Sequence, residues 1–168
     1  MAPMKRLVLP IALAFVLSSL AATPARAATL HNDTVSGIEL FPGFVVGEVR
    51  YGAAFVARAT GDLPGYITAY INYTPPNPGP GVTNTVVGGR WALSVYQGGE
   101  FKGKLAGTIS GGAATWNATG TLATIKLDLA VVGGTGTYTG ATGIGSFTGF
   151  LSHLTFPPQW GGALTLSF

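Results

Sequence analysis

Apolar and polar residues alternate along residues 45–59, and this pattern constrains the fold more than any other feature of the chain. Small or apolar residues occupy the odd positions, as Val45, Gly47, Val49, Tyr51, Ala53, Phe55 and Ala57. The charged residues Glu48, Arg50 and Arg58 all fall on even positions. A period of two indicates a β-strand with one buried face. Parity does not say which face is buried, so the charged face is either a solvated exterior or a polar interior.

The same alternation recurs along the rest of the chain. The expected strands cover 66–74, 86–96, 101–109, 114–131, 144–156 and 163–168. Within 114–131 the apolar residues change from even positions such as Trp116 to odd positions such as Ile125, which predicts a β-bulge near Leu122. About eight strands with no crossover helix predict an all-β fold, a small antiparallel β-barrel, with a sandwich as the alternative architecture.

Glycine and proline support this fold class. The 26 glycines would each cost a helix interior about 0.5–1 kcal/mol relative to alanine, whereas barrels use glycine for turns and bulges. Residues 75–85 contain four prolines, which lack the backbone donor that a central strand needs. We expect a long loop there, acting either as a functional lid or as a simple linker.

The first 27 residues have the three parts of a secretory signal peptide. Lys5 and Arg6 form a positive region, and residues 7–20 form an apolar run too short to span a bilayer comfortably. Ala25 and Ala27 are small residues at the positions that a signal peptidase reads. We expect cleavage of 1–27, leaving 28–168 as a single barrel domain that is secreted or periplasmic. It would meet a membrane only transiently through the signal peptide; an uncleaved anchor is the alternative.

Cleavage changes the charge balance of the protein. The chain has nine basic and six acidic residues, and Lys5, Arg6 and Arg26 would leave with the signal peptide. The remaining domain is near neutral and lacks the basic surface that a nucleic-acid partner requires. The chain contains no cysteine, which excludes disulfides, cysteine nucleophiles and thiolate metal sites. We expect neither a metal nor a cofactor.

Candidate site residues follow from the strand faces. The aromatic residues on apolar faces of successive strands are Tyr51, Phe55, Tyr73 and Trp91. They line one ligand cavity or fill the core, because a small barrel can do either. His153 shares its parity with Phe147 and Leu151. It is either a general base inside the barrel or a satisfied histidine of the core or rim.

A glycine-rich segment, residues 129–149, reads LAVVGGTGTYTGATGIGSFTG. Its glycines permit a tight corner with positive φ, onto which Tyr138 can fold back. It lacks the Lys-Ser/Thr ending of a phosphate loop. The segment resembles the signature of the allene oxide cyclase and dirigent barrel superfamily. The resemblance is carried by Gly133, Gly134, Thr135, Gly136, Tyr138, Ala141 and Gly143.

The resemblance implies an eight-stranded barrel of calycin-like shape, with an interior cavity for a small hydrophobic molecule and a trimeric assembly. Plant members cyclise a fatty-acid-derived epoxide or steer the radical coupling of phenols. The cysteine of the cyclase pocket has no counterpart here, which argues against that reaction. We therefore expect an exported barrel that binds a small hydrophobic ligand, with cyclase/isomerase-like or dirigent-like steering of it. The alternative is a non-catalytic structural or surface-interaction domain that makes contacts through 75–85 and Trp160.

Overall fold

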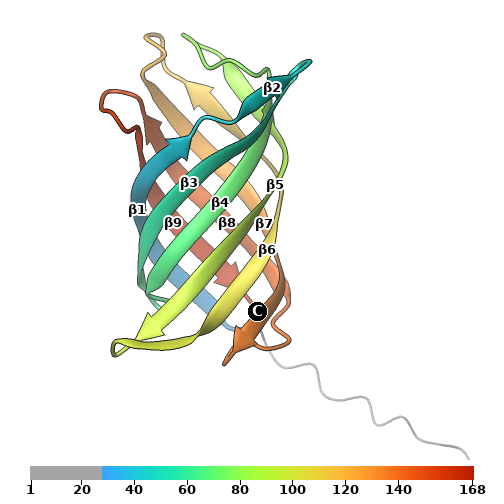
Figure 1. The fold of residues 1–168 in the computed structure, drawn as a ribbon, viewed down its shortest axis with the longest axis vertical. Helices are drawn as coiled ribbons and strands as arrows, with labels where there is room; N and C mark the ends of the chain where they lie inside the picture. Colours follow the sequence, from blue (N-terminus) through green and yellow to red (C-terminus); the bar gives the residue numbers. More distant parts are fainter. Residues whose placement is uncertain (1–27) are drawn as a thin grey trace, which may run out of the picture.

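A computed structural model describes residues 28–168, and in it eight long strands form a closed antiparallel β-barrel with one short extra strand (Figure 1). The strands are β1 (Leu30–Phe41), β2 (Phe44–Val46), β3 (Val49–Gly61), β4 (Gly65–Thr74), β5 (Thr83–Gln97), β6 (Glu100–Trp116), β7 (Leu122–Gly136), β8 (Gly143–Ser152) and β9 (Gln159–Ser167). The expected all-β barrel is thus confirmed. The expected signal peptide, 1–27, lies outside the described residues.

Strands that follow each other in sequence are paired around the barrel, and β1 pairs with both β9 and β3 to close it. The upper end of the barrel in Figure 1 carries β2 and the loops 75–82, 117–121 and 153–158. The lower end carries the turns 62–64, 98–99 and 137–142. No helix within residues 28–168 is long and apolar enough to cross a membrane.

The segment 45–59, expected as one strand, is divided between β2 and β3 by a turn at Gly47, whose φ is 58°. A bulge follows: Arg50 pairs with Tyr73 and Ala53 with Ile71, so β3 has one extra residue there. Gly52, with a φ of 68°, allows this backbone shape. The extra residue reverses the parity, so Arg50 faces the barrel interior and Tyr51 faces outward.

The bulge predicted near Leu122 is wrong, because the chain turns there instead. β6 ends at Trp116 and β7 begins at Leu122. The side-chain oxygen of Asn117 accepts hydrogen bonds from the backbone N–H of Thr121 at 2.9 Å and of Leu122 at 3.3 Å. An Asx-type turn of this kind reverses the chain direction between β6 and β7. Whether the buried residues of β6 fall on odd or even positions therefore predicts nothing about the buried positions of β7.

The lower half of the barrel is filled by large apolar side chains. Leu93 of β5 is paired with Leu105 of the adjacent strand β6, and both are fully buried. Leu63, Val95 and Leu166 are buried with them at the lower end. Protein interiors are close-packed around side chains of this kind, and none of these five residues lines either of the cavities of about 340 and 40 Å³.

The glycine-rich corner lies at this lower end. Gly133 and Gly134 belong to β7, and of the three glycines at 133, 134 and 136 only Gly136 has a positive φ, of 61°. A Cβ on Gly134 would collide with the carbonyl oxygen of Tyr138 and lie 2.8 Å from its Cβ. Tyr138 packs edge-on against Phe168, with ring centroids 6.1 Å apart. The corner therefore lies at the lower end, where Tyr138 and Phe168 are partly buried against the core, away from the loops of the upper end.

The filled lower half predicts a strong dependence of stability on its leucines. Leu93→Ala should lower the free energy of unfolding by about 2–5 kcal/mol, because it leaves a cavity in close-packed surroundings. The matched change Leu122→Ala, at a position that is 41% exposed, should alter it by less than about 0.5 kcal/mol. Urea denaturation measures both. Equal effects of the two changes would contradict this description of the core.

Candidate ligand-binding cavity

A cavity of about 340 Å³ occupies the upper half of the barrel. Its walls are apolar side chains from the strands, namely Phe55, Ile71, Val86, Trp116, Ile125, Leu127 and Leu151. Its mouth lies between β1 and the loops of the upper end, with Pro42, Pro78 and Pro158 among the lining residues. Ala114 of β6 also lines it, where a larger side chain would fill the space.

A smaller cavity of about 40 Å³ lies deeper in the barrel and has only apolar residue types and tryptophan in its lining. The two cavities share Phe55, Ile71, Ile125 and Leu127. Trp91 lines the deeper one, and its buried indole N–H has no hydrogen-bond partner. The interior of the barrel is thus an apolar shaft that narrows from the mouth toward the filled lower half.

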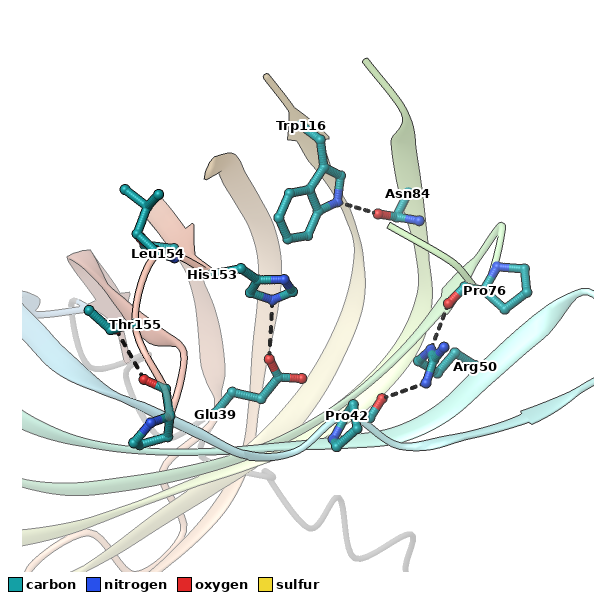
Figure 2. Close-up of polar contacts among 11 residues, drawn as sticks. Glu39, Pro42, Arg50, Pro76, Asn84, Trp116, His153, Leu154 and Thr155 are labelled. Atoms are coloured by element: carbon teal, nitrogen blue, oxygen red, sulfur yellow. Dashed lines mark hydrogen bonds and ion pairs between the residues drawn. The ribbon is translucent and has the colours of Figure 1, made fainter. Parts of the chain in front are cut away.

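Polar side chains gather at the mouth of this shaft (Figure 2). Glu39 of β1 is only 8% exposed, and its Oε2 lies 3.5 Å from Nε2 of His153, which directly follows β8. The backbone N–H of His153 donates to the carbonyl oxygen of Thr121 at 2.8 Å, which fixes its position. Tyr73 and Arg50 line the same space.

Burial shifts the pKa of two groups at the mouth, Glu39 and Tyr73. It raises the pKa of Glu39 above its ordinary value of 4.5, and the nearby His153 and Arg50 only partly oppose this effect. Burial also raises the pKa of Tyr73 to about 12, with Arg50 opposing and Glu39 adding to the rise. The Tyr73 hydroxyl is therefore protonated at neutral pH and can donate a hydrogen bond to a ligand.

Arg50 holds two segments of the upper end together. Its Nε donates to the carbonyl oxygen of Pro76 at 2.6 Å, and its Nη1 donates to that of Pro42 at 3.3 Å. Its Nη2 donates to Oδ1 of Asn77 at 3.1 Å. The proline-rich loop, expected over 75–85 and ending where β5 begins at Thr83, is thereby fixed beside the cavity mouth.

Asn84 connects the same loop to the cavity wall. The indole N–H of Trp116 donates to Oδ1 of Asn84 at 2.6 Å, and Nδ2 of Asn84 donates to the carbonyl oxygen of Pro75 at 2.7 Å. The Trp116 ring lies 4.7 Å from the His153 ring, measured between centroids. The wall, the loop and the polar cluster are therefore one connected structure.

The structure brings three of the four aromatic candidates to the cavities. Phe55 lines both, Tyr73 the upper one and Trp91 the deeper one. Tyr51 does not join them, because the bulge after Arg50 turns it outward, where it contacts Phe44. His153 lies at the cavity mouth, in the loop after β8 rather than within the strand.

Sequence reasoning missed Glu39, and it placed Arg50 and Arg58 on one face, whereas Arg50 lines the cavity and Arg58 is exposed on the outside. Glu39 shares the parity of the buried residues Asp33 and Val35 in β1, and that shared parity was the available signal. Trp160, expected as an exposed contact, is instead buried in β9. Its indole N–H donates to the carbonyl oxygen of Val56 at 3.1 Å.

Comparison of the chain with protein-family models, curated proteins and solved structures found no match. Within the range 28–168, no three histidine, aspartate or glutamate side chains are grouped closely enough to hold a metal ion. The cavity and its polar mouth are therefore the features of the molecule that point to a function.

The raised pKa of Glu39 predicts a pH dependence of stability. As pH rises above 4.5, the unfolded chain loses the proton of Glu39 before the folded protein does, so ionisation of this carboxyl reduces stability. Glu39→Gln removes this penalty, so the variant should gain stability relative to the wild type as pH rises from 4 to 7. Urea denaturation across this range measures the difference, and a difference that shrinks with pH would contradict the assignment.

His153→Asn provides the partner experiment. His153 lowers the pKa of Glu39, so its removal should make the loss of stability with rising pH steeper than in the wild type.

The hydrogen bonds of Arg50 predict that it restrains the proline-rich loop. Arg50→Ala should speed amide hydrogen exchange in residues 77–85 by about tenfold, since hydrogen bonds to a charged group contribute about 1.5–3 kcal/mol. Arg58→Ala, on the outer face of the same strand, is the matched control. Equal exchange in the two variants, measured by mass spectrometry, would show that Arg50 does not hold the loop.

Proposed function

We propose that the protein is an exported barrel that binds a small hydrophobic ligand in the upper half of its interior. One observation carries the proposal: a cavity of about 340 Å³ with apolar walls and a polar mouth, in a barrel whose other half is filled. Ligand pockets of proteins are about 300–1,000 Å³ in volume and combine mainly apolar walls with a few placed polar groups. A purely structural domain has no need for such a space, so the cavity favours ligand binding over that alternative.

The distribution of polar groups describes the ligand. Its body would lie against Phe55, Ile125 and Leu127, in the part of the shaft without charges. A polar group of the ligand would lie near the mouth, within reach of Tyr73, His153 and Glu39. Burial of the apolar body supplies the affinity, and the mouth fixes which end enters first.

Cyclase/isomerase-like or dirigent-like steering is the chemical part of the proposal. A narrow apolar shaft restricts a flexible reactant to few conformations, and holding reacting atoms in place contributes to rate without a dedicated catalytic group. The polar mouth would orient the reactant relative to the wall. Binding is tested first, because steering requires it.

Filling the cavity should weaken the binding of an apolar ligand. N-phenyl-1-naphthylamine, a neutral apolar dye, should fluoresce on binding the wild-type protein. Ala114→Phe places a ring in the cavity and should weaken binding by about tenfold or more. Thr115→Phe adds the same ring at the neighbouring exposed position and should leave binding unchanged. A fluorescence titration measures all three proteins.

Two outcomes would contradict ligand binding. One is the absence of dye binding by folded wild-type protein, and the other is equal binding by both phenylalanine variants. Mass spectrometry of material extracted from protein purified in its native compartment then identifies the natural ligand.

A further inference from the structure

The upper end of the barrel presents a set of large apolar side chains to solvent. We define the apolar rim as Leu40, Phe41, Phe44, Val46, Leu154 and Phe156, all of which are exposed. Phe156 is 98% exposed, so its ring projects from the loop without a neighbour to cover it. Figure 1 shows that β2 and the loop 153–158 lie at the same end of the barrel. Large exposed apolar patches mark interaction sites, and these six exposed side chains share one end of the barrel.

The apolar rim is continuous with the ligand cavity. Leu40 and Phe41 belong to the rim and also line the cavity of about 340 Å³, and the fully exposed Phe156 borders its mouth. The backbone N–H of Glu39 donates to the carbonyl oxygen of Pro158 at 2.9 Å, which holds the loop 153–158 against β1. An apolar molecule could therefore pass from the surface covering the rim into the cavity along apolar side chains.

The net charge of the upper end of the barrel is close to zero. Residues 40–46 and 154–158 contain no charged side chain, and Glu48 in the adjoining turn and Arg50 in β3 have opposite signs. Such a surface has no basic cluster to attract anionic lipid headgroups, so binding to a bilayer would not depend on anionic lipid. Its means of binding is the insertion of side chains into an apolar phase, as in interfacial membrane proteins.

We propose that the apolar rim docks the upper end of the barrel onto the surface of a lipid bilayer, with the cavity opening toward the lipid. A bilayer fits better than a protein partner because the rim consists of projecting side chains from separate segments, and because a ligand of the apolar cavity would itself dissolve in lipid. The purpose of docking rests on the proposed function, but docking itself requires no ligand.

A tryptophan placed in the rim tests the proposal directly. In the full chain, Phe156→Trp should shift its emission to shorter wavelength when phosphatidylcholine vesicles are added, and brominated phosphatidylcholine should quench it. Ile144→Trp is the matched control, because Ile144 is a 72% exposed residue near the opposite end of the barrel. Its emission should be unaffected. A Phe156→Trp emission that vesicles do not change would overturn the proposal.

Vesicle flotation provides the second measurement. The pair Leu154→Ser and Phe156→Ser should lower the partition coefficient by about tenfold relative to the pair Val132→Ser and Ile144→Ser, which are exposed elsewhere on the barrel. Residues 1–27 are the same in both double variants, so a difference between their partition coefficients is due to the rim residues. Binding should be the same for phosphatidylcholine alone and for mixtures with phosphatidylglycerol.

Two flotation results would overturn docking: equal partition of the two double variants, or binding only to anionic vesicles. A dimer in solution that the rim variants abolish would overturn it as well. The last would mean that a second copy of the chain covers the rim. Dye binding without vesicle binding would contradict docking alone, whereas vesicle binding without dye binding would contradict the proposed function alone.

Discussion

Hydrogen bonds between β1 and β3 join the two ends of the sheet, in a register that runs from Asp33–Gly61 to Phe41–Ala54. This pairing turns an open sheet, with two aggregation-prone edges, into a barrel without them. It also sets the interior width, because eight strands enclose a space that side chains just fill or that holds one small ligand. β1 contributes more than closure, since it carries Glu39 into the interior and binds the loop 153–158 through Pro158. The cavity, its polar mouth and the apolar rim all depend on this one strand.

The two halves of the interior differ in whether their side chains favour folding. Buried leucines pack in the lower half, with the glycine-rich corner at its end, and supply stability. The upper half contains features that do not favour folding: an empty volume, a buried carboxyl whose ionisation is opposed by burial, and a fully exposed phenylalanine. Residues that break the ordinary rules of packing and polarity tend to gather where a protein functions. Their concentration at one end is the physical argument for a binding site there.

Alternation in the sequence predicts the fold class, most strands and the inward positions of Phe55, Tyr73 and Trp91, because side-chain direction has a period of two. It fails where the backbone gains a residue or turns. The bulge after Arg50 exchanges the faces of Arg50 and Tyr51, and the turn at Asn117 separates strands expected to be continuous. The strand β1 carries Asp33 and Glu39 on its inner face, so its buried positions do not appear as an apolar series. The export signal and the resemblance to allene oxide cyclase and dirigent barrels stay predictions.

The central claim is that an apolar molecule occupies the upper half of the barrel. A crystal structure of the protein soaked with a brominated aromatic ligand tests it most directly, because the anomalous signal of bromine locates the ligand without bias. The account predicts a peak inside the barrel, between Phe55 and Trp116, with the polar end of the ligand near Tyr73. Bromine bound only on the outer surface, with protein side chains filling the space between Phe55 and Trp116, would contradict it.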